Sequence, residues 1–80
     1  MPTLRLFAQA RETAGTSHDR LDGASVAEVL EAAVSRYGPA FEAVLATAKV
    51  WVNGEPAIPS DEVGADDEVA VLPPVSGGAG

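Results

Sequence analysis

The sequence has no cysteine and only one histidine, His18, among its 80 residues. The absence of cysteine excludes disulfides, thiolate metal sites and a side-chain sulfur nucleophile. It also agrees with a reducing cytoplasm, where we expect the protein to act. A single histidine cannot assemble a zinc site without further histidine or cysteine ligands. We therefore expect this chain to bind no metal and no cofactor of its own.

Basic residues are also few. Five lysines and arginines stand against twelve aspartates and glutamates, which gives a formal net charge of −7. This balance repels the phosphates of nucleic acids, so we expect no nucleic-acid partner. It favours basic protein partners, although acidity also simply keeps a small domain soluble. No apolar run approaches the roughly 20 residues of a membrane span and no signal-peptide pattern opens the chain, so we expect no membrane association.

The first twenty residues predict two strands joined by a turn. Residues 3–8 alternate in polarity and contain β-favouring side chains, which indicates an opening strand. Residues 11–15 are expected to form a turn that ends at Gly15, where a positive φ is tolerated. Residues 17–21 then form a second strand, antiparallel to the first.

The clearest element is a helix that starts after Ser25. Ser25 and Glu28 have the spacing of a capping box, and Gly38 followed by Pro39 stops the helix. A shorter helical segment is expected over residues 39–46, with Phe41 and Leu45 facing inward. The apolar residues of the main helix fall on one stripe at helical spacing: Val26, Val29, Leu30, Ala33, Val34 and Tyr37.

Strand signals return after the helices. Residues 48–52 indicate a strand, and Asn53-Gly54 is the strongest dipeptide signal for a tight hairpin turn. Prolines in the returning segment restrict it to a short edge strand, and residues 69–72 form the last strand. The sequence therefore predicts an α+β roll, in which one main helix packs on one face of a mixed sheet. We expect one domain over residues 1–75 and a flexible, glycine-rich tail over residues 76–80.

Strand alternation predicts an exposed apolar surface on the face of the sheet away from the helix. Phe7, Trp51 and Leu72 fall on that face, where one main helix leaves nothing to cover them. An apolar patch ringed by charge is typical of surfaces that bind partners; the alternative is that a loop or the short helix covers part of it. The helix side receives Leu4, Leu6, Val50, Val52, Val69 and Val71, and the other side Arg5, Phe7, Lys49, Trp51, Ala70 and Leu72.

Several segments together resemble the MoaD family, the small subunit of molybdopterin synthase, within the MoaD/ThiS superfamily of ubiquitin-like sulfur carriers. The resemblance spans nearly the whole chain and implies the β-grasp (ubiquitin-like) fold. The segments that carry it are Leu6-Phe7-Ala8, Arg11-Glu12 with Gly15, residues 50–55 (Val-Trp-Val-Asn-Gly-Glu), Asp67-Glu68-Val69 and residues 73–78 (Pro-Pro-Val-Ser-Gly-Gly).

The resemblance also implies the chemistry of the C-terminal glycine. In the family, an E1-like enzyme of the MoeB type uses ATP to adenylate the terminal carboxylate, and sulfur transfer then gives a thiocarboxylate. The large synthase subunit, of the MoaE type, uses that sulfur to build the dithiolene of molybdopterin. The chain is then not catalytic alone. Its reactive residue is Gly78, with Gly77 slim enough to enter a narrow channel. The partner-binding residues expected are Phe7, Arg11, Leu72, Pro73, Pro74, Val75 and Ser76.

This sequence departs from the family pattern after the second glycine, because Ala79 and Gly80 follow Gly78. Three explanations are open. A metalloprotease removes the two residues, which we favour; the activating enzyme accepts Gly80 as the terminus; or the two residues are not native to the chain.

Other functions share parts of this pattern. A sulfur carrier can serve thiamine, cysteine or a secondary metabolite in place of molybdopterin. A ubiquitin-like protein modifier would join Gly78 to lysines of its targets through an isopeptide bond. A plain interaction module would leave the tail inert.

Overall fold

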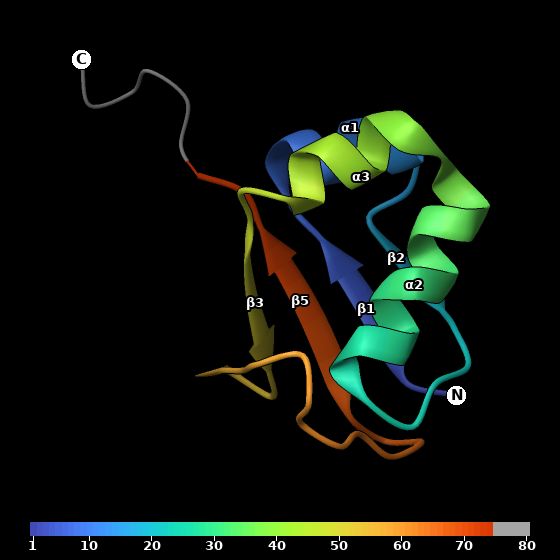
Figure 1. Ribbon diagram of the computed structural model, residues 1–80, viewed down its shortest axis with the longest axis vertical. Coiled ribbons are helices and arrows are strands. Elements are labelled where there is room, and N and C mark those ends of the chain that lie inside the picture. Colours follow the sequence, from blue (N-terminus) through green and yellow to red (C-terminus); the bar gives the residue numbers. More distant parts are fainter. Residues whose placement is uncertain (75–80) are drawn as a thin grey trace.

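The computed structural model describes residues 1–74 and shows a mixed sheet with helices on one side (Figure 1). The strand order is β2-β1-β5-β3-β4. The two central strands, β1 and β5, are parallel, and every other pairing is antiparallel. This confirms the predicted α+β roll with a mixed sheet. The strands are β1 (Thr3–Leu6), β2 (His18–Arg20), β3 (Lys49–Val52), β4 (Glu55–Pro56) and β5 (Glu68–Leu72), and the helices are α1 (Ala8–Ala14), α2 (Val26–Tyr37) and α3 (Pro39–Leu45).

The helix α1 is the main departure from the sequence prediction. Residues 8–14 are helical, so the opening strand ends at Leu6 and the turn expected over residues 11–15 is wrong. Alanines at positions 10 and 14 favour a helix, but Ala10 is its only buried residue. A seven-residue helix with one buried side chain shows no apolar stripe, and for this reason the sequence pattern did not predict it. Gly15 does adopt the expected left-handed conformation, with φ of 77°, and caps α1.

The main helix begins and ends where the sequence predicts. The Ser25 Oγ accepts a hydrogen bond from the Glu28 N–H at 3.2 Å. The Glu28 carboxylate returns to the N–H of Ala24, at 2.9 Å, instead of the N–H of Ser25 that a standard capping box would use. Gly38, with φ of 95°, ends α2 and begins α3. Phe41 of α3 is fully buried, as expected, and Leu45 is partly buried.

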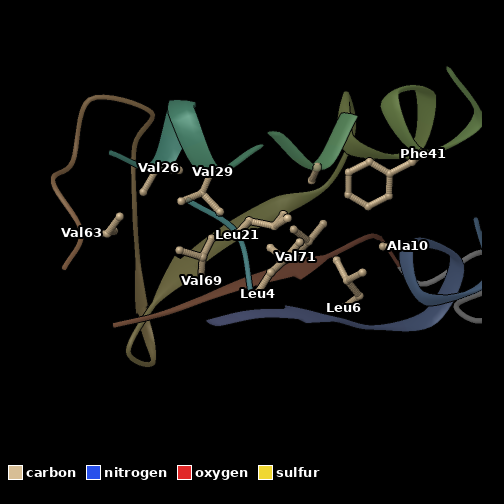
Figure 2. Close-up of a cluster of buried hydrophobic side chains, with 11 residues drawn as sticks. Leu4, Leu6, Ala10, Leu21, Val26, Val29, Phe41, Val63, Val69 and Val71 are labelled. Carbon is tan, nitrogen blue, oxygen red and sulfur yellow. The ribbon is translucent and has the colours of Figure 1, made fainter. Parts of the chain in front are cut away.

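The core lies between the sheet and the helices (Figure 2). Leu4, Leu6, Val69 and Val71 point from the central strands toward α2 and α3, and each is at most 2% exposed. Burying one such side chain stabilises the fold by about 1.5–3 kcal/mol. The predicted inner face is therefore confirmed at its centre, while Val50 and Val52 of β3 are only partly buried. The core is completed by Ala10, Leu21, Val26, Val29, Ala33, Phe41 and Val63.

The hairpin between β3 and β4 forms at the predicted dipeptide. Asn53 and Gly54 have φ of 51° and 83°, as a type I′ turn requires. The Asn53 amide donates to Asp67 and its oxygen accepts from the Glu68 N–H, both at 2.9 Å. Asp67 also accepts from the Gly64 N–H at 2.7 Å, and these bonds, the Gly64 bond foremost, lower the pKa of its carboxyl. The turn is thus fastened to the start of β5.

The predicted division between domain and tail lies at residues 75–76, outside the described residues. Within residues 1–74, no helix is long and apolar enough to span a bilayer. The same range places no group of three or more histidine, aspartate or glutamate side chains where they would hold a metal ion.

Candidate functional site

The candidate site is the face of the sheet that the helices leave uncovered, which we call the outer face. Strand alternation places it opposite the buried Leu4, Leu6, Val69 and Val71. Register then aligns the outward residues across strands. His18, Arg5, Ala70, Trp51 and Pro56 form one row, and Leu72 and Lys49 lie side by side in the next. The outer face consists of Thr3, Arg5, Phe7, His18, Arg20, Lys49, Trp51, Pro56, Glu68, Ala70 and Leu72.

Parallel pairing brings the start of the C-terminal segment beside Phe7. Because β1 and β5 run in the same direction, both strands leave the sheet at the same end, next to α1 and α3 (Figure 1). Leu6 pairs with Val71. One step further along the two strands, Phe7 and Leu72 occupy neighbouring positions on the outer face. An apolar pair therefore lies where the chain departs toward Gly78.

Phe7 is the exposed apolar anchor of this face. It is 39% exposed and remains extended after β1 before the chain turns into α1. The Arg5 guanidinium carbon lies 5.5 Å from the centre of the Phe7 ring, a cation–π contact worth about 0.5–1 kcal/mol at an exposed site. Arg5 also pairs with Glu68 at 3.4 Å, and both side chains are nearly half exposed, at 46% and 45%. Arg5 is therefore held beside Phe7 and restricts the positions that the ring can take.

The apolar patch is smaller than the sequence predicted. Leu72 and Trp51 are both only partly exposed. Trp51 is paired with Pro56, so the returning strand β4 lies directly beside it. Phe7 and Leu72 remain at its centre.

The remaining predicted contact residues divide into three groups. Arg11 is exposed on α1, and its N–H donates to the Phe7 carbonyl at 3.4 Å, one turn into the helix. Pro73 is buried and anchors the end of β5 to the body, whereas Pro74 is exposed. Val75, Ser76, Gly77 and Gly78 lie outside the described residues.

Two residues of this face were missed by the sequence reasoning. His18 and Arg20 project outward from β2 because Asp19, between them, pairs with the inward-facing Leu4. The alternation in residues 17–21 carried this information.

Comparison with known proteins decides the family. A family model described as the ThiS family matches residues 4–78. The chain belongs to the ThiS family. Its sequence is 35% identical over 77 residues to the molybdopterin synthase sulfur carrier subunit of Chlamydomonas reinhardtii, covering 90% of this chain and 92% of that protein. The resemblance to MoaD/ThiS sulfur carriers drawn from the sequence is thereby confirmed.

Solved structures confirm the ubiquitin-like β-grasp fold of this ThiS-family chain. The crystal structure of small archaeal modifier protein 1 from Haloferax volcanii superposes with a TM-score of 0.85 at 36% identity, covering 95% of this chain and 97% of that one. The solution structure of the protein of the same name from Methanosarcina acetivorans also gives a TM-score of 0.85, at 30% identity, covering 95% and 94%.

Proposed function

We propose that this ThiS-family chain is the sulfur-carrying small subunit of a molybdopterin synthase. The observation that carries the proposal is the identity of 35% to a sulfur carrier subunit of that enzyme, over 90% of the chain. The family match also runs on past the described residues and ends at Gly78, the residue proposed to react. The chain would work in the cytoplasm, where ATP is available to its activating enzyme.

The proposed chemistry takes place at the Gly78 carboxylate, after hydrolysis of the peptide bond that follows it by a trimming metalloprotease. An oxygen of the carboxylate attacks the α-phosphorus of ATP on a MoeB-type, E1-like enzyme, and pyrophosphate leaves. The resulting acyl-adenylate has a good leaving group, so a donor of sulfide-level sulfur such as hydrosulfide attacks the carbonyl carbon, a C–S bond replaces the C–O bond to the phosphate, and AMP departs. The product is a thiocarboxylate. No side chain of this protein takes part, and the chain binds neither ATP nor a metal in this scheme.

The body of the protein would contribute binding and positioning. Phe7 and Leu72 form the apolar centre of the contact with the activating enzyme, and later with the MoaE-type large subunit, while Arg11 contacts the rim. Five residues from Pro74 to Gly78 can span at most about 17 Å, enough to reach a catalytic pocket in the partner. Docking beside the start of this segment therefore determines where the terminal glycine arrives.

Reconstitution with the two partner enzymes tests the proposal. Three forms of the chain, ending at Ser76, Gly78 and Gly80, are incubated with the activating enzyme, ATP, a sulfur donor, the large subunit and the cyclic pterin precursor. We expect molybdopterin from the form ending at Gly78, and none from the form ending at Ser76. A product of equal yield from all three forms, or from none, would contradict the assignment. Thiamine, cysteine or another metabolite as the sulfur acceptor would be indicated if the thiocarboxylate forms but the pterin is not converted.

Protein modification is the second candidate. It is favoured by the 36% identity and near-complete coverage shared with a protein named small archaeal modifier protein 1. In this case the activated Gly78 carbonyl would be attacked by a lysine amine of a target protein. Higher-mass conjugates that appear with the chain ending at Gly78, and disappear when ATP is withheld, would support modification. An inert interaction module would form neither a thiocarboxylate nor conjugates.

A further inference from the structure

Charge is divided unequally between the outer face and the rest of the molecule. The outer face carries three of the five basic residues, Arg5, Arg20 and Lys49, and only one of the twelve acids, Glu68. With His18 counted as neutral, its formal charge is +2. The two remaining cations and eleven acids therefore give the rest of the chain a formal charge of −9 within the total of −7.

The fold produces this separation in β2. His18 and Arg20 point to the outer face, whereas Asp19 turns toward α2 and accepts hydrogen bonds from Tyr37 at 2.5 Å and Arg36 at 2.8 Å. The hydroxyl of Tyr37 and the guanidinium of Arg36 lower the pKa of the Asp19 carboxyl, against the opposing effect of burial. Asp19 is thereby kept charged on the helix side of the sheet, whereas His18 and Arg20 lie on the outer face.

The outward N–H groups of β2 are already occupied. The Arg20 N–H donates to the Asp19 carboxylate at 2.8 Å, and the His18 N–H donates to the Thr16 hydroxyl at 3.4 Å. A partner strand would have to displace these bonds to pair with the edge. The outer face, and not this edge, is therefore the surface open to a partner.

Arg5 and Lys49 flank the apolar centre, whereas Arg20 lies two outward rows away, in the row of Thr3 and Glu68. Arg5 lies over Phe7, and Lys49 lies beside Leu72. The ion pairs formed within residues 1–74 are Arg5–Glu68 and Arg36–Asp19. Arg20 and Lys49 therefore have no carboxylate partner in this part of the chain, and both are exposed.

We propose that the outer face docks onto a protein surface that presents an apolar pocket and carries carboxylates on the same face, one beside the pocket and one about two strand rows away. The pocket would receive Phe7 and Leu72, and the carboxylates would pair with Arg20 and Lys49. This inference rests on the proposed function for the identity of the partner, the activating enzyme, and adds the chemistry of its contact surface. It reverses the expectation of basic partners drawn from net charge. At physiological ionic strength the Debye length is about 8 Å, so the acids on the helix side are largely screened from a partner at the sheet face.

The same arrangement disfavours two other occupants. A second copy of the chain that approached through its own outer face would bring together two surfaces that each carry a formal charge of +2. A nucleic acid would find three cations on this face, but a chain of phosphates longer than the face would reach past it to the acids of the rest of the molecule. A protein surface no larger than the outer face can pair its carboxylates with the cations there, without contacting the acids on the rest of the molecule.

The test measures the affinity of the chain ending at Gly78 for its E1-like activating enzyme. In the first variant, Arg20→Gln and Lys49→Gln together lower the net charge by two. A matched control lowers it by the same amount on the helix side, through Ser35→Glu and Ala43→Glu at exposed positions of α2 and α3. We expect the Kd of the first variant to rise about three- to tenfold and its dependence on salt to weaken, with the control within about twofold of the parent.

Each alternative outcome has a distinct meaning. Equal weakening by both variants would show a net-charge effect and overturn the proposal, as would unchanged binding of the first variant. Phe7→Ala distinguishes failure of this proposal from failure of the proposed function. If Phe7→Ala loses binding while Arg20→Gln/Lys49→Gln binds normally, the outer face is still the docking surface, and only the preference for carboxylates is wrong. If Phe7→Ala also binds normally, the docking surface of the proposed function is wrong as well. Binding of a labelled oligonucleotide that Arg20→Gln/Lys49→Gln abolishes would overturn the proposal in favour of nucleic acid.

Discussion

The strand β5 shows how differently the two faces of one sheet are used. Val69 and Val71 are fully buried under the helices, whereas Glu68, Ala70 and Leu72, alternating with them, lie on the outer face and are only partly covered. The inner residues determine the fold through close packing, and a change in side-chain volume of even one methylene there alters the stability. The outer residues carry little of that packing, so they are free to hold charge and an apolar centre for a partner. Stability and binding are therefore expected to respond to different substitutions only one residue apart.

The largest effect is expected from removing a side chain of the inner layer. Phe41 is fully buried and meets Tyr37 edge to face, with ring centres 5.2 Å apart. Phe41→Ala should lower the free energy of unfolding by about 3–5 kcal/mol, a large part of what a domain of this size has. Denaturant unfolding followed by circular dichroism measures the change. Phe41→Leu keeps most of the volume and should cost clearly less; equal losses in the two variants would contradict tight packing at this position.

The matching experiment on the outer face should separate binding from stability. Phe7→Ala should change the free energy of unfolding by less than about 1 kcal/mol, because the ring is already partly exposed and loses mainly its contact with Arg5. The Kd for the activating enzyme should rise at least tenfold, as for an apolar anchor at the centre of an interface.

Ile58 provides the control for Phe7. It is the more exposed residue, at 60% against 39%, and lies in the segment after β4. Ile58→Ala should leave both the affinity for the activating enzyme and the stability nearly unchanged. If it weakens binding as much as Phe7→Ala does, exposed apolar area in general, and not the outer face, would be responsible.

Much of the difference between the two faces could be predicted from the sequence. Alternation assigned the inward residues of β1 and β5 correctly, and Asn53-Gly54 fixed the hairpin, because both signals depend on local geometry. The helix α1 was missed because its burial rests on Ala10 alone and its contacts with α3 come from a distant part of the chain. Trp51 is only partly exposed, and its neighbour on that face depends on the register in which β4 pairs with β3. Pro73 is buried because of the position at which β5 ends relative to the rest of the domain. Neither follows from residue spacing.

A smaller effect is expected where β2 is fastened to the helix side. Burial and the hydrogen bond to Asp19 raise the pKa of Tyr37 to about 12, and the bonds from Tyr37 and Arg36 lower the pKa of Asp19. The depressed pKa of Asp19 adds stability that is present above its ordinary value of 3.8 and is lost as the pH falls below it. The raised pKa of Tyr37 adds stability below pH 10 that is lost as the pH rises from 10 toward 12.

Thermal unfolding of the parent and of Asp19→Asn across this pH range measures the contribution. The parent should be more stable near pH 7 by about 1 kcal/mol, and the difference should shrink below pH 4. A difference that stays constant through the acidic range would show that the charge of Asp19 contributes nothing. The difference in stability between the parent and Tyr37→Phe should likewise shrink as the pH rises above 10.

The smallest effect is expected from the exposed pair between Arg5 and Glu68. Glu68→Gln removes an ion pair in which both side chains are nearly half exposed, so stability should change by less than about 0.5 kcal/mol. The same substitution makes the outer face more positive, and the affinity for the activating enzyme should stay equal or improve slightly. A clear loss of affinity, measured by titration calorimetry, would contradict an acidic contact surface on the partner.

In the proposed function, the folded body positions a terminal glycine that carries sulfur. The intact mass of the chain ending at Gly78 tests this most directly, recorded before and after incubation with the activating enzyme, ATP and a sulfur donor. We expect a product in which one oxygen is replaced by sulfur, with the change confined to the C-terminal fragment. A mass that stays unchanged, while the chain is folded and bound to the activating enzyme, would contradict sulfur carriage and leave protein modification or an inert interaction module.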